Sequence, residues 1–93
     1  MAYASPFDTI VCELRFKLFV WTLDLCRAGY KLQFTLSEYK HVNEVDLEIT
    51  LRDIQGNLLE LLKIEDIQVD IGLIHHVTTY LNGHFIQYGL HLN

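Results

Sequence analysis

The chain has 93 residues, of which 51% are hydrophobic, and a formal net charge of −5. This length predicts one domain over residues 1–93 with enough apolar side chains for a packed core. The acidic balance argues against nucleic acid or an anionic membrane as partner, since both are bound by clustered Lys and Arg.

The first third of the chain allows two interpretations. Apolar and charged residues alternate between Cys12 and Leu18, which favours one long bent strand. The alternative is an N-terminal helix, residues 5–28, packed on an antiparallel sheet, with Ser5 as its cap and Pro6 at its first position. The apolar stripe of that helix would consist of Phe7, Val11, Leu14, Leu18, Trp21 and Leu25.

No basic start precedes an apolar run here, and the chain has no stretch of 18 apolar residues. We therefore expect no signal peptide or transmembrane segment, and a location in the cytoplasm or within an intracellularly assembled particle. Two cysteines, Cys12 and Cys26, do not make a disulfide framework, so we expect both as reduced, buried thiols.

Further along, residues 30–36, 45–52 and 67–71 alternate apolar and polar side chains, the pattern of half-buried strands. Three turn signals separate such segments: Ala28-Gly29, the loop 54–56, and Asn82-Gly83. In the hairpin that turns at residues 54–56, the expected register pairs Leu51 with Leu59. Together these elements predict an all-β fold, an antiparallel sandwich or small barrel of six or seven strands built from hairpins.

Charge is unevenly distributed along the chain. Residues 44–70 carry eight acids and two bases, whereas residues 71–93 carry no Asp, Glu, Lys or Arg. An uncharged hairpin at a sheet edge would aggregate, so we expect it to be central in the sheet, covered, or paired with another subunit. The candidate interface residues are His76, Tyr80, Phe85 and His91 of this hairpin, with Asp46 and Glu48 of the acidic strand as a second contact.

Residue patterns that carry chemistry are weak. His76 and His91 would share one face of the hairpin, but no zinc-ligand spacing accompanies them. The chain has no nucleophile-elbow sequence and no glycine-rich phosphate loop. We therefore assign no catalytic residue, metal or cofactor.

The sequence favours a non-enzymatic β-domain that acts as a subunit of a homo- or hetero-oligomeric assembly. Its partner would be a protein or a second copy, met through the uncharged C-terminal hairpin; a small structural component of a virion, phage or other particle is an example. One alternative is a small acidic inhibitor or adaptor that occupies a basic groove of another protein. Another is a small metal- or ligand-binding barrel.

Overall fold

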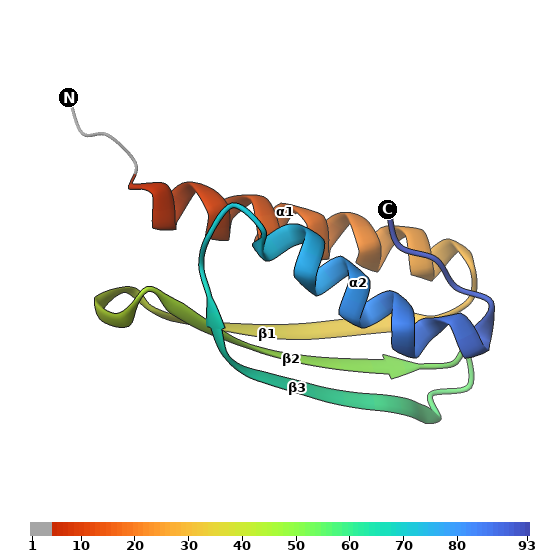
Figure 1. The fold of residues 1–93 in the computed structure, drawn as a ribbon. Helices are drawn as coiled ribbons and strands as arrows, with labels where there is room; N and C mark the ends of the chain where they lie inside the picture. Colours follow the sequence, from red (N-terminus) through yellow and green to blue (C-terminus); the bar gives the residue numbers. More distant parts are fainter. Residues whose placement is uncertain (1–4) are drawn as a thin grey trace.

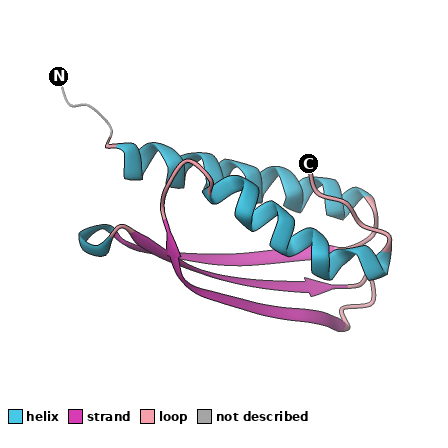
Figure 2. Cartoon of the chain, viewed as in Figure 1, coloured by secondary structure: helices cyan, strands magenta, loops and turns pink. Residues whose placement is uncertain are grey.

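The computed structural model describes residues 5–93 as a helix, three strands and a second helix (Figure 1). The elements are α1 (Pro6–Arg27), β1 (Lys31–Tyr39), β2 (Glu44–Arg52), β3 (Leu58–Gln68) and α2 (Leu73–Phe85). The strands form one antiparallel sheet in the order β1-β2-β3, and both helices lie on the same face of it (Figure 2). The fold is therefore α+β, and the predicted all-β sandwich or barrel is wrong.

Helix α1 begins and ends with local signals in its own sequence. The Ser5 hydroxyl accepts a hydrogen bond from the Asp8 amide at 3.1 Å, and Pro6 occupies the first helical position. At the other end Gly29 takes φ +90°, and the Tyr30 amide donates to the Leu25 carbonyl at 2.9 Å. The strand interpretation and the hairpin at residues 28–29 are therefore wrong, and the helical alternative describes this segment.

Residues 31–68 form the predicted strands, with a corrected register. The β2–β3 turn lies at residues 53–57, and Gly56 adopts the left-handed conformation, with φ +87°. Leu51 pairs with Glu60 instead of Leu59, because the register shifts between Leu51 and Arg52. The predicted strand at 67–71 is only the end of β3 and the loop that follows it.

The predicted hairpin at Asn82-Gly83 is wrong, because both residues lie inside α2. Its buried side chains recur every four residues, at Leu73, Val77, Leu81 and Phe85, as on one face of a helix. The uncharged segment is thus one of the two helices that cover the sheet.

Asn82 also holds the end of the chain in place. Its side-chain amide donates to the Leu92 carbonyl at 3.0 Å and accepts from the Leu92 amide at 2.7 Å. This pair of hydrogen bonds places the Leu90 and Leu92 side chains in the core, where both are buried.

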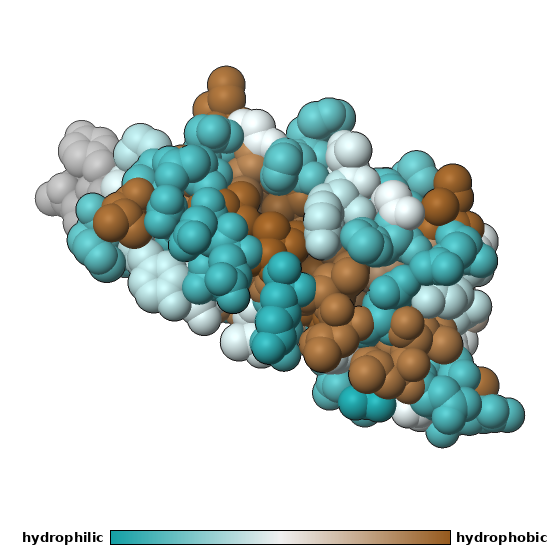
Figure 3. Space-filling view, turned by 60° about the horizontal axis from the view of Figure 1, so that its bottom comes forward, coloured by the Kyte–Doolittle hydropathy of each residue, from teal (hydrophilic) through white to brown (hydrophobic). Residues whose placement is uncertain are grey.

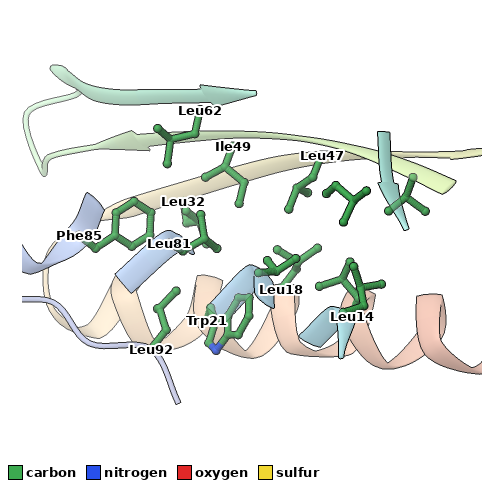
Figure 4. Close-up of a cluster of buried hydrophobic side chains, with 14 of the residues drawn as sticks. Leu14, Leu18, Trp21, Leu32, Leu47, Ile49, Leu62, Leu81, Phe85 and Leu92 are labelled. Atoms are coloured by element: carbon green, nitrogen blue, oxygen red, sulfur yellow. The ribbon is translucent and has the colours of Figure 1, made fainter. Parts of the chain in front are cut away.

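A single hydrophobic core fills the space between the sheet and the two helices (Figure 4). Leu14 and Leu18 of α1 point toward the sheet, whereas Trp21 lies beside Leu92 and its indole N–H donates to the Asn93 carbonyl at 3.0 Å. All six residues of the predicted helical stripe are buried. Among the described residues, no polar or charged residue is buried.

Candidate protein-interaction surface

A second row of apolar side chains runs along the other side of α1. It consists of Cys12, Phe16, Phe19, Leu23 and Cys26, and is called the outer stripe below. Its members are spaced by 4, 3, 4 and 3 residues, the heptad spacing of a helix that packs against another helix. All five are exposed, including 67% of Phe16, 57% of Phe19 and 62% of Leu23.

The outer stripe and the buried stripe are related by a fixed offset. Each outer position lies five residues after a buried one; Cys12 follows Phe7, and Leu23 follows Leu18. Five residues turn an α-helix through about 140° beyond one full turn, so the two stripes face nearly opposite directions. One stripe therefore packs on the sheet and α2, and the other faces outward.

The outer stripe adjoins the first strand of the sheet. The Phe19 ring meets Phe34 of β1 edge to face, with centroids 5.2 Å apart. Phe34 is itself only half-buried, so the apolar surface continues from the helix toward the edge of the sheet.

A hollow lies at each end of the outer stripe. The N-terminal hollow has a volume of about 670 Å³ and is lined by Cys12, Phe16 and Ile74 among others. The C-terminal hollow, about 660 Å³, lies between Cys26 and Ile54 at the tip of the β2–β3 turn. Single exposed apolar residues are ordinary, but a continuous row ending in two hollows is typical of a docking surface.

Both cysteines belong to this surface, and the prediction that they are buried is wrong. Cys12 and Cys26 are exposed free thiols at the two ends of the outer stripe. Helical geometry explains the difference. On a strand, Cys12 and Leu14 would lie on the same face, whereas on a helix two residues that are two positions apart point about 200° away from each other.

The residues of the predicted hairpin interface lie on α2 and in the C-terminal segment instead of on a hairpin. Phe85 is fully buried in the core, whereas Tyr80 is half-buried and contacts the tilted His84 ring, with ring centroids 4.8 Å apart. His76 is exposed on α2, and His91 is exposed in the C-terminal segment. An interface role for these exposed residues stays a prediction.

The predicted acidic contact lies on the face of the sheet that the helices leave uncovered. Asp46 and Glu48 both belong to this face, which Figure 3 brings forward as a largely hydrophilic surface broken by hydrophobic groups. The hydrophobic residues on β3 include Leu58 and Leu61, which are about half exposed. Glu48 lies 3.9 Å from the Lys63 ammonium, so part of the acidic charge is balanced within the sheet.

Asp46 has a structural task as well. One of its carboxylate oxygens accepts a hydrogen bond from the Asp66 amide at 2.9 Å. Asp66 has φ +57° beside a register shift between β2 and β3, so the carboxylate stabilises an irregular point of the sheet. Hydrogen bonding to Asp46 also raises the pKa of the Tyr39 hydroxyl.

The other titratable groups with shifted pKa values also have local partners. The Lys40 ammonium, 3.0 Å from Asp8, lowers the pKa of that carboxyl through a hydrogen bond. Burial, followed by a hydrogen bond to Glu60, raises the pKa of Tyr88. These contacts connect α1 to the turn after β1, and the segment after α2 to β3, so each shift has a structural cause.

Within residues 5–93, no group of three or more His, Cys, Asp or Glu side chains is arranged to hold a metal ion. The predicted metal- or ligand-binding barrel has no counterpart, because the three-stranded sheet is open. Neither described helix combines the length and the apolar character needed to cross a membrane. Comparison with protein-family models, curated proteins and solved structures gave no match to this chain.

Proposed function

We propose that this protein is a non-enzymatic subunit of a protein assembly and that it docks through the outer stripe of α1. The observation that carries the proposal is the exposure of five apolar side chains at heptad spacing on a helix that already buries a complete stripe in its own core. Water contact with such a row is unfavourable, and covering it with a partner removes that cost.

Other features support a binding role over a catalytic one. Catalytic sites usually gather titratable groups with shifted pKa values in one pocket. Here the shifted groups are dispersed, and the surface that lines the N-terminal hollow consists almost entirely of apolar atoms, although Asp8, Glu13 and Lys17 border it. Among the described residues, every buried side-chain nitrogen and oxygen has a hydrogen-bond partner.

The proposal is tested by photo-crosslinking in the cells that make the chain. A photoreactive amino acid replaces Phe19 on the outer stripe or, as a matched control, the exposed Thr35 on the uncovered sheet face. We expect a defined protein adduct from position 19 and none from position 35. No adduct from position 19, or equal adducts from both positions, would contradict the proposal.

The acidic adaptor is a second candidate, supported by the position of Glu44, Asp46 and Glu48 on the uncovered face. The exposed acid Glu65 of β3 is close to the same surface. A basic partner would meet these carboxylates together. Reversing Glu48 and Glu65 to Lys should abolish binding of a polylysine peptide; unchanged binding would eliminate this candidate.

A further inference from the structure

The charges beside the outer stripe indicate what covers it. Glu13, Val20 and Arg27 each follow a stripe residue by one position and are seven residues apart, so they line one flank of the stripe. The flank is acidic near the start of α1 and basic at its end. A surface with this polarity is complementary to itself when one copy is reversed.

Both flanking charges are available to a partner. Glu13 makes no ion pair within the described chain, and Arg27 has only a 3.9 Å contact with Asp24. The Arg27 side chain is 83% exposed. Neither charge is therefore fully neutralised by its own protomer.

We infer that the outer stripe of α1 binds the outer stripe of a second copy of this chain, with the two helices antiparallel and related by a twofold axis. This inference rests on the proposed function and names its partner. In antiparallel coiled-coil packing the two stripes interleave. The register that brings Glu13 opposite the second copy's Arg27 places Val20 against Val20, Phe19 against Leu23, and Phe16 against Cys26.

The opposite orientation is less favourable. Two parallel copies would place Glu13 beside Asp8, which Lys40 already pairs, and Arg27 beside Thr22, so neither flanking charge would meet an opposite charge. The helix dipoles would also be aligned, with both positive ends together. Antiparallel packing avoids both effects.

The two hollows lie on different flanks of the outer stripe. The N-terminal hollow is lined by Glu13 and by Ile74 of α2, whereas the C-terminal hollow is lined by Thr22, β1 and the β2–β3 turn. A twofold axis brings like flanks of the two helices together, so each hollow lies at the margin of the helix–helix contact. The contact is of the isologous kind that twofold dimers use.

Sedimentation equilibrium of the reduced 93-residue chain, from about 1 to 500 µM, tests the inference. We expect a monomer–dimer equilibrium in this range. Glu13→Arg alone and Arg27→Glu alone should each weaken association at least about tenfold, because each creates two like-charge contacts across the dimer. The double exchange should restore it, and Glu65→Arg on the sheet should have no effect. A monomer throughout the range, or no rescue by the double exchange, would overturn the inference.

A disulfide trap tests the orientation. In Phe16→Cys, the new thiol should cross-link to Cys26 of the second copy under mild oxidation, and peptide mapping identifies the pair. Cross-links that join identical positions would show a parallel dimer and refute the antiparallel register. Photo-crosslinking at Phe19 separates the two claims: an adduct with a different protein retains the proposed function but refutes self-association, whereas no adduct refutes the proposed function.

Discussion

The same substitution at two leucines of α1 should have two different consequences. Leu18 belongs to the buried stripe and is 0% exposed, whereas Leu23 belongs to the outer stripe and is 62% exposed. Leu18→Ala removes a buried side chain and leaves a cavity, which costs about 3–5 kcal/mol of the free energy of unfolding. For a domain of this length that is a large part of the whole stability, which is about 5–14 kcal/mol.

Leu23→Ala should change the unfolding free energy of the isolated protomer by no more than about 0.5 kcal/mol, as at other exposed positions. The substitution should instead weaken association of the two copies. Covering the exposed part of this leucine contributes about 1 kcal/mol for each copy, so a dimer would lose about 2 kcal/mol, or about thirtyfold in Kd.

Urea unfolding, followed by the fluorescence of the single, buried Trp21, measures both effects. At low protein concentration Leu18→Ala lowers the midpoint and Leu23→Ala leaves it unchanged. The urea midpoint of the wild type should rise with protein concentration, because a dimer is stabilised by mass action. In Leu23→Ala the midpoint should rise much less. If Leu23→Ala destabilised the dilute protomer as much as Leu18→Ala does, the assignment of two separate stripes would be wrong.

Three further predictions follow from individual contacts. Asn82→Ala removes both hydrogen bonds to Leu92 and should lower the unfolding free energy by about 1–3 kcal/mol, with faster amide exchange in residues 90–93; unchanged exchange would show that the segment is held by other contacts. Lys40 lowers the pKa of Asp8, so the ionised carboxyl stabilises the fold above its unfolded-state pKa of about 4. This contribution is lost as the pH falls through the folded-state pKa. In urea titrations, Asp8→Asn should therefore lose less stability than the wild type below about pH 4. Asp46→Ala should destabilise the β2–β3 pairing, seen as faster exchange at Asp66, whereas Glu48→Ala should change stability by less than about 1 kcal/mol; equal effects would refute the structural task assigned to Asp46.

The N-terminal segment shows why the sequence suggested a strand. The alternation between Cys12 and Leu18 comes from two helical stripes that interleave, with Leu14 and Leu18 in the buried one and Cys12 and Phe16 in the outer one. A helix with a single apolar stripe would not produce this pattern. The ambiguity therefore arose from the same residues that make the outer stripe a candidate docking surface.

At the C-terminal end, a local turn signal conflicts with a longer periodicity. Asn82-Gly83 favours a tight hairpin turn, but the four-residue spacing from Leu73 to Phe85 specifies a helix whose face the sheet buries. Packing against the sheet decides between the hairpin and the helix, and a short stretch of sequence does not contain this information. The central strands were predicted correctly in outline, because their alternation has no helical competitor, whereas the register depended on bulges that the apolar pattern does not reveal.

The outer stripe itself was readable in the sequence as a second heptad pattern. The strand interpretation hides this pattern, because it places Cys12 and Phe16 on the inward face with Leu14 and Leu18. The charge difference between Glu13 and Arg27 acquires meaning only once a helix aligns the two side chains on one flank.

The two native thiols provide the most direct measurement of the central claim, that a second copy covers the outer stripe. The rate of maleimide labelling of Cys12 and Cys26 is measured as the protein concentration rises, with Thr35→Cys on the uncovered sheet face as the control thiol. We predict that labelling of Cys26, which lies opposite the second copy's Phe16, slows with concentration while the control rate stays constant. A labelling rate of Cys26 that stays constant as the protein concentration rises, as the control rate does, would contradict the claim.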